Sequence, residues 1–301
     1  MRISKTLISA VAKQREAVEL SEELRRYWAD HIDVAYHAPD DYTYCSSRFW
    51  EGYEYLPYAG PAWDFELQKS AASAVNRCEA NILAGPLFVS EQYPWPTGKQ
   101  GKPLAPILQF DLRIATGIQR DSGLFEHPVD FGDGLLQVWF DNKILDAICR
   151  VVPRSEADPK KLLPIPGDLR PAPRCRDFID VDWTEGAPVY VIKSLRSPQY
   201  MTSESFEFDV APELFPRRLR AKRRRLVTLL KWLEKVSSKA RGSHLFGTFH
   251  LVRYAAPERP KCFLQLDTKG PSMWGDFATA QVFYEVQEKG EIKFSFDWGH
   301  Y

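Results

Sequence analysis

Two short segments place a glutamine and an aspartate on alternate positions, and this arrangement can bring carboxylates to one face of a sheet. They are residues 108–111 (LQFD) and 264–267 (LQLD). Because side chains alternate across a strand, the apolar pair and the polar pair of each segment lie on opposite faces. We therefore predict core positions at Leu108, Phe110, Leu264 and Leu266, and polar faces that carry Gln109, Asp111, Gln265 and Asp267.

The same order of motifs occurs twice, which predicts an internal duplication. The first set is 83–87 (LAGPL), 107–111 (ILQFD) and 137–141 (QVWFD), and the second is 245–249 (LFGTF), 263–267 (FLQLD) and 281–285 (QVFYE). Two such halves could line a common groove with their polar faces, where carboxylates act as general acid and base. The structural alternative is that these glutamines and aspartates satisfy backbone groups at strand ends and turns.

The other reactive side chains form no catalytic or metal-binding pattern. The six histidines lack zinc-motif spacing, although His244 and His250 flank a predicted strand and could converge on Asp267. The five cysteines are odd in number and include no C-x-x-C pair, which favours a reducing compartment over a disulfide framework. No G-x-S-x-G elbow is present. We expect neither a metal nor a cofactor.

Aromatic residues supply candidate contacts for a partner. The glycine between Trp274 and Asp276 permits a tight bend that exposes either side chain, and tryptophan is favoured at interface hot spots. The alternative is a Trp274 packed over the sheet with Asp276 capping a turn. Residues 38–66 alternate aromatic and polar types, which predicts short strands or loops. The predicted partner-binding residues are Asp111, Asp267, Trp274, Asp276, Trp50 and Tyr53.

A basic helix is predicted over residues 213–241, with Pro216 at its start and Gly242 after its end. This segment holds eleven basic and two acidic residues. Its apolar residues follow helical spacing, so the basic side chains point outward. The predicted basic surface comprises Arg217, Arg218, Arg220 and Arg224. It is either a solvated face that pairs with acidic segments or a surface for nucleic acid or an acidic partner.

Further elements follow from periodicity. We predict helices over 3–36 and 64–82, and strands over 189–192 and 206–210. Dense prolines over 151–175 exclude regular structure. The predicted fold is α+β, with two similar halves of antiparallel or mixed sheets, an N-terminal helical arm and a long basic helix before the last strands. The predicted divisions are 1–40 (arm), 41–150 (first half), 151–187 (connection) and 188–301 (second half).

Composition places the chain among globular proteins of the cytoplasm. It has 301 residues, with 40 basic and 40 acidic side chains, so its total charge does not favour nucleic acid or a membrane. No apolar run approaches the ~20 residues of a membrane span. The apolar residues 7–12 are too few for a signal peptide and precede charged residues, so we predict an amphipathic helix there.

The motifs resemble the YwqG-like family of bacterial proteins. The matching segments are 94–96 (PWP), 101–104 (GKPL), 108–112 (LQFDL), 134–141 (GLLQVWFD), 263–267 (FLQLD), 273–276 (MWGD) and 294–298 (FSFDW). The chain departs from the family pattern where it carries Thr268 and Lys269 instead of Ser-Asp, which halves an acidic pair. The resemblance implies an α+β fold with duplicated halves and no established reaction. Some relatives lie near secreted toxins, which implies a protective role.

These features favour a non-enzymatic binding protein, an immunity protein that occludes the active or substrate-binding cleft of a bacterial toxin. One alternative is an enzyme or small-ligand receptor that uses Asp111, Asp267 and Asp276 between the halves. Another is nucleic-acid binding through the basic helix, although a protein partner is the expectation.

Overall fold

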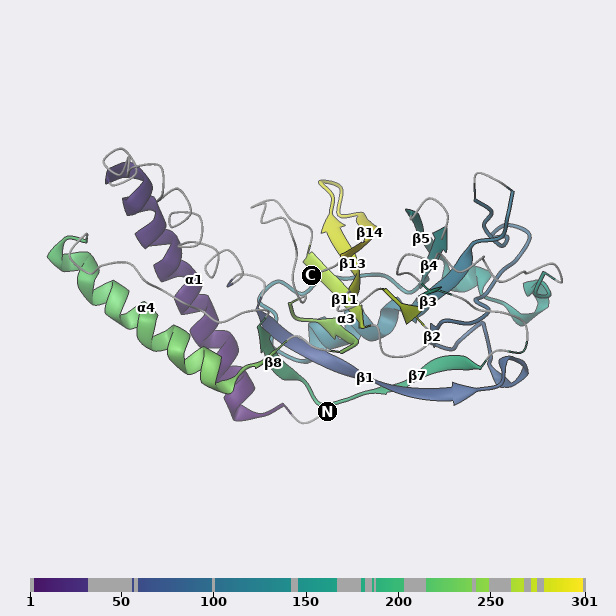
Figure 1. Cartoon of the computed structure of the whole chain (residues 1–301), viewed down its shortest axis with the longest axis horizontal. Coiled ribbons are helices and arrows are strands. Elements are labelled where there is room, and N and C mark those ends of the chain that lie inside the picture. The colour runs from purple at the N-terminus through teal and green to yellow at the C-terminus, as the bar shows by residue number, and fades with distance from the viewer. Residues whose placement is uncertain are drawn as a thin grey trace. The chain divides into compact units, whose positions relative to one another are not determined.

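The computed structural model describes most of the chain as two compact units. The described residues are 3–31, 56, 59–98, 101–141, 146–166, 180–181, 186, 188–202, 215–239, 242–248, 261–267, 272–274 and 279–299. Unit 1 comprises Met1–Trp63, Ser197–Arg241 and Phe246–Arg259, and unit 2 comprises Asp64–Arg196, Gly242–Leu245 and Pro260–Tyr301. Helices accompany a large and mostly antiparallel sheet, so the fold is α+β (Figure 1).

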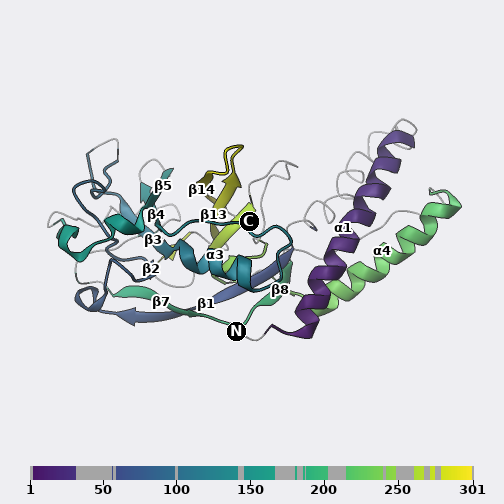
Figure 2. The same ribbon diagram turned by 180° about the vertical axis from the view of Figure 1, so that it is seen from behind.

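Unit 1 is built on two long helices, α1 (Lys5–His31) and α4 (Arg217–Val236), which lie side by side (Figures 1 and 2). The predicted spacing of leucines on α4 is confirmed, because its buried residues are Leu219, Leu226, Leu229, Leu230 and Leu233. Proline precedes the helix as predicted. The helix ends before the predicted boundary, since Ser237 is already extended and leads into strand β9 (Ser238–Lys239). Strand β8 (Gln199–Thr202) pairs with β9 and with the start of β1.

The sheet follows the order β14-β13-β11-β10-β1-β7-β2-β3-β4-β5 within the described residues. Its strands are β1 (Gly60–Ser70), β2 (Ile82–Leu83), β3 (Ala105–Asp111), β4 (Leu135–Asp141), β5 (Asp146–Val152), β7 (Val189–Leu195), β10 (His244–Phe246), β11 (Lys261–Asp267), β13 (Thr279–Val286) and β14 (Ile292–Gly299). Strands β6 (Asp180–Val181) and β12 (Ser272–Met273) form a separate pair. Helix α3 (Leu112–Asp121) follows β3 directly. The outermost strands β5 and β14 approach each other, so the sheet of unit 2 curls.

The helix predicted over 64–82 is wrong, because β1 runs to Ser70 and only a 3-10 turn, Ala72–Ala74, follows. Charged and polar residues between Phe65 and Ser70 imitate helical spacing. The segment is extended because its backbone pairs with β7, from Phe65 opposite Leu195 to Ser70 opposite Val189. That partner is more than 100 residues away in sequence, so no local pattern could reveal it.

Other predicted elements have mixed outcomes. The strand at 189–192 is confirmed as the start of β7, and the helix over 3–36 is confirmed as the shorter α1. The strand predicted at 206–210 lies outside the described residues. In the proline-rich stretch, β5 continues to Val152, and the 3-10 turns Arg154–Glu156 and Pro159–Lys161 follow.

Aromatic rings from both motif sets share the core of unit 2. Phe110 on β3 meets Phe263 on β11 edge-on, with ring centroids 5.9 Å apart, and Phe131 lies 5.1 Å from Phe263. Phe140 on β4 packs against Phe296 on β14. The four predicted core positions, Leu108, Phe110, Leu264 and Leu266, are all buried. Among the described helices, none is long and apolar enough for a membrane crossing.

Candidate functional site

The strands that carry the predicted polar residues pair in matching registers. Gln109 on β3 lies opposite Gln137 on β4, and Gln265 on β11 lies opposite Gln281 on β13. An irregularity in each register precedes the glutamine, between Pro106 and Leu108 in one pair and between Cys262 and Leu264 in the other. In both β3 and β11 the glutamine therefore follows a local bend at the same position.

The strands β2 and β10, which precede β3 and β11 in the chain, also match in backbone conformation. Ala84, after β2, and Phe246, at the end of β10, have φ angles of 52° and 58°, in the left-handed region. Each precedes a glycine that a neighbouring strand approaches closely. A Cβ on Gly85 would lie 2.6 Å from Val189, and one on Gly247 would lie 2.6 Å from Ala62. Only glycine fits such contacts, so both strands turn at a sterically fixed point.

The glutamines do not line an open groove, because all four are buried. Gln109 accepts a hydrogen bond from the Phe88 N–H (2.8 Å) and donates to the carbonyls of Arg77 (2.8 Å) and Ala80 (3.0 Å). Gln137 donates to the Phe88 carbonyl (2.7 Å) and to Gln109 (2.9 Å). For these residues the structural alternative is confirmed. They hold the backbone around Arg77, Ala80 and Phe88, before β3, against the face of the sheet that carries the glutamines, since buried backbone groups require partners.

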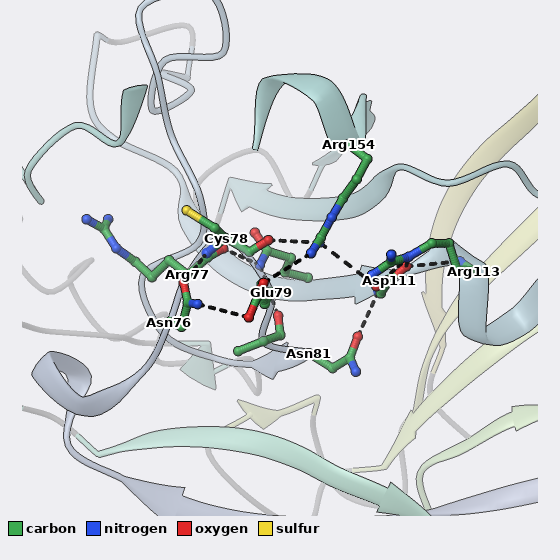
Figure 3. A network of polar contacts seen from close by, with 10 residues as sticks. Asn76, Arg77, Cys78, Glu79, Asn81, Asp111, Arg113 and Arg154 are labelled. Atoms are coloured by element: carbon green, nitrogen blue, oxygen red, sulfur yellow. Dashed lines mark hydrogen bonds and ion pairs between the residues drawn. The ribbon is translucent and has the colours of Figure 1, made fainter. Parts of the chain in front are cut away.

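Asp111 ends β3 and begins α3. Its carboxylate accepts a hydrogen bond from the Arg113 N–H (3.0 Å), which caps the helix. The Arg113 guanidinium also binds it, with Nε 3.0 and 3.1 Å from the two carboxylate oxygens (Figure 3). The Asp111 N–H donates to Asn81 (2.7 Å). Asp111 is therefore a buried structural carboxylate that holds a two-pronged ion pair.

A second arginine completes this network. Arg154, in the 3-10 turn after β5, lies 3.9 Å from Asp111 and 3.6 Å from Glu79 and donates to the Cys78 carbonyl (2.9 Å) (Figure 3). The Arg113 and Glu79 side chains are 54% and 66% exposed, whereas that of Asp111 is 7% exposed. We call Asp111, Arg113, Arg154 and Glu79 the Arg113 patch. Its exposed charges are the cation of Arg113 and the carboxylate of Glu79, and Asp111 is the buried residue that holds Arg113 in place.

Electrostatics keep the charge of Arg113 fixed at this patch. Hydrogen bonds from Arg113 to Asp111, and the negative charge of Asp111, raise the pKa of the Arg113 guanidinium above its ordinary value. Arg113 thus stays cationic. Burial raises the pKa of the neighbouring Cys78 thiol, which disfavours its thiolate form. Among the described residues, no group of three metal-ligating side chains is present.

The remaining predicted contact residues do not gather around Asp111. The Asp267 N–H donates to Ser243 Oγ (3.0 Å), and the residue is half-buried at the end of β11. Trp274 is fully buried against Phe140 and Phe296, as in the packed alternative, so it offers no surface to a partner. Asp276, Trp50 and Tyr53 lie outside the described residues, as does His250. His244 is buried, with Nδ1 3.1 Å from the Gly242 carbonyl.

The basic residues of α4 include two that pair with α1 and those of the predicted basic surface. Lys222 pairs with Glu23 and Arg225 pairs with Glu16, both on α1. These contacts are the pairing with acidic segments that sequence reasoning weighed. Arg217, Arg218, Arg220 and Arg224 are exposed.

Sequence reasoning missed Arg113 and Arg154. The spacing of Arg113, two residues after Asp111, was a usable signal because a carboxylate at a helix start often caps the residue two positions on. For Arg154 no local signal exists, since it lies 43 positions after Asp111. Comparisons with protein-family models and with curated proteins found no match to this chain. The YwqG-like resemblance therefore stays a prediction.

Proposed function

We propose that this protein is a non-enzymatic binding protein and that a protein partner contacts the Arg113 patch. The observation that carries the proposal is that Arg113 is anchored through two nitrogen atoms while half of its side chain remains exposed. A fixed arginine loses little conformational entropy when it binds, and arginine is enriched at interface hot spots. Glu79 and Arg154 beside it supply charges that select a complementary surface.

The partner that we propose is a bacterial toxin domain, which would make this chain an immunity protein acting in the cytoplasm. The support is the resemblance to YwqG-like proteins, some of whose relatives lie near secreted toxins. Binding over the toxin's active or substrate-binding cleft would neutralise it without chemistry by this chain. Asp111 serves such a role as an anchor, because its carboxylate is already committed to Arg113.

We also propose that unit 2 contains two copies of one ancestral half. The sheet order reads alike from both ends, with β10, β11, β13 and β14 corresponding to β2, β3, β4 and β5 around the central β1 and β7. The matching registers, bends and positive φ angles support this correspondence. On this proposal, α1 is an addition to the duplicated core, as a helical arm.

Affinity capture from the native host, paired with co-expression of candidate toxins, tests the proposed function. We expect the wild-type chain to retain a stoichiometric partner and to protect cells from it. Glu79→Lys should abolish both, because it reverses an exposed charge while leaving the Asp111–Arg113 pair intact. Arg113→Glu should do the same where it still folds.

Arg120→Ala is the matched control for Arg113, since both arginines are exposed and lie on α3. Arg120 pairs with Asp121 instead of Asp111. Equal loss of capture in the control and in Glu79→Lys would place the contact elsewhere. A wild-type chain that captures no stoichiometric partner and gives no protection would refute the immunity role.

A further inference from the structure

A row of exposed cations runs along one side of α4. We call Arg217, Arg220, Arg224, Lys231 and Lys235 the basic row, and each of these side chains is exposed. Steps of three, four and seven residues keep side chains on one side of a helix. At 1.5 Å per residue the row is about 27 Å long. The helix Arg217–Val236 contains a single acidic residue, Glu234, so the positive potential along the row is nearly continuous.

On the opposite side of α4, the basic side chains form ion pairs with glutamates of α1. There Glu23 lies 2.6 Å from Lys222, and Glu16 lies 2.6 Å from Arg225. On the basic row, by contrast, no ion pair to a carboxylate is found among the described residues. Arg220 Nε donates to the Phe215 carbonyl, which steadies the side chain without neutralising it.

The residues between these cations indicate what kind of partner fits. Ala221, Val227 and Thr228 are the neighbours on this side of the helix; Ala221 and Thr228 are exposed and small, and Val227 is half-buried. A protein interface is built around apolar and aromatic residues with charges depleted from its centre. Nucleic acid differs, since most of its affinity for proteins comes from phosphates neutralised by lysine and arginine. A row of cations with no exposed large apolar side chain among them therefore fits a phosphate backbone.

We propose that the basic row binds the phosphate backbone of nucleic acid without reading its sequence. The row contains three arginines, which bind phosphate oxygens through two parallel hydrogen bonds, and two lysines, which act as point charges. This activity is located in unit 1 and does not rest on the proposed immunity role. The Arg113 patch belongs to unit 2, so each proposal can fail without the other.

Fluorescence anisotropy with the full chain tests the proposal. The probes are a 24-base-pair DNA duplex, single-stranded DNA and single-stranded RNA of the same length, titrated over a series of salt concentrations. With four to five phosphates neutralised, the slope of log affinity against log salt should be about −4 for duplex. Preference among the three probes identifies the form of nucleic acid. Poly-glutamate serves as the competing polyanion.

The decisive variant is Arg217→Glu/Arg224→Glu/Lys231→Glu, which we expect to weaken binding by more than about tenfold and to reduce the salt slope by about 3. Its control is Lys160→Glu/Lys289→Glu/Lys293→Glu, which changes net charge equally at exposed sites in unit 2. If the charge-reversed chain misfolds, the milder Arg217→Gln/Arg224→Gln/Lys231→Gln variant replaces it. This variant should also bind nucleic acid more weakly than the wild type.

Three results would overturn the proposal. The first is absence of wild-type binding to every nucleic acid at low salt. The second is equal weakening by the row variant and the unit 2 control, which would reveal dependence on net charge alone. The third is competition by poly-glutamate as strong as that by duplex at equal charge, which would assign the row to an acidic protein.

Discussion

The β3–β4 pair and the β11–β13 pair place glutamines alike but differ in what lies around them. Gln109 faces Gln137 and Gln265 faces Gln281, each after a bend at the same position. In the next strand outward, however, Arg150 lies opposite Gln137, whereas Asp297 lies opposite Gln281. The sheet thus fixes the glutamines, while the outer strand is free to carry opposite charges.

The Arg150 position shows what this freedom permits. Its guanidinium donates to Gln137 (2.8 Å) and to the Pro94 carbonyl (2.8 Å) and lies 5.3 Å from the ring of Trp139. Burial lowers the pKa of Arg150 to about 10. Carbonyl groups and an aromatic face stabilise this cation, so the loop before β3 is tied to the outer strand as well as to the glutamines. Asp297 cannot make these contacts, because it carries no donor.

The strongest test of the likeness between the two pairs is their shared core. Phe110→Ala should lower the free energy of unfolding by about 3–5 kcal/mol, because the fully buried ring leaves a cavity. Urea denaturation measures this change. Val286→Ala, at an exposed site on β13, should stay within about 0.5 kcal/mol.

Phe263→Ala should have a similar effect, and the double variant should be less destabilised than the sum. Phe110 and Phe263 touch edge-on, so removing one ring already removes part of what the other contributes. Strict additivity would contradict a single core shared by β3 and β11.

The glutamines give the next largest effect. Gln109→Leu should destabilise unit 2 by at least about 2 kcal/mol, because the Phe88 N–H and two carbonyls lose their buried partner. Exposed Gln68 provides the control variant Gln68→Leu. Gln265→Leu sharpens the comparison, since Gln265 donates to the Gly242 carbonyl (3.1 Å). If Gln265→Leu leaves the free energy of unfolding unchanged, the likeness of the two pairs is limited to their backbones.

A smaller effect should come from the positive φ at Ala84. Ala84→Gly should raise the unfolding free energy by about 0.5–1 kcal/mol, because glycine adopts the left-handed region without the strain of a Cβ. Ala71→Gly is the control at an ordinary φ of −72°, where glycine should destabilise. Thermal unfolding measures both. Destabilisation by Ala84→Gly would show that the turn does not hold strain.

The smallest effect concerns the α1–α4 pairing in unit 1. The hydrogen bond from Arg225 lowers the pKa of Glu16, so the stabilisation is complete above the ordinary glutamate pKa. It is lost as the pH falls through the lowered value. Because both side chains are largely exposed, we expect well under about 1 kcal/mol.

Glu16→Gln should remove the pH dependence of stability that comes from the Glu16–Arg225 pair. Helix unfolding followed by circular dichroism from pH 7 to pH 3 measures it. Glu19→Gln, on an exposed side of the same helix, should keep it. Identical pH profiles for wild type and Glu16→Gln would exclude a contribution from this ion pair.

Part of unit 2 could be predicted from alternation alone. The parity of residues 108–111 and 264–267 correctly placed four core side chains, because a buried strand face requires apolar residues at every second position. The same parity also put the glutamines on the other face. It did not reveal that this face is covered in the first pair, since the covering backbone, around Arg77 and Phe88, precedes β3 and carries no pattern that points to it.

The candidate site was only half accessible to sequence reasoning. Asp111 was identified by its position after Gln109, but its role depends on Arg154, which reaches it from beyond β5. Trp274 was singled out as a distinctive contact residue, yet the sheet encloses it against Phe140. Burial of an aromatic residue depends on which strands surround it, and a local motif does not specify that.

By itself, the sequence determined the core residues of the strands at 108–111 and 264–267, the position of Pro216 at the start of α4, and that the leucines of α4 face inward while its arginines face out. These properties follow from local periodicity, which the chain carries in every short segment. Tertiary structure alone decided that 64–70 is extended, that Gln109 and Gln137 hold backbone groups, and that Arg154 reaches Asp111. Each of these outcomes rests on hydrogen bonds or packing between segments distant in sequence or on the way the chain turns, and local patterns do not encode such partners.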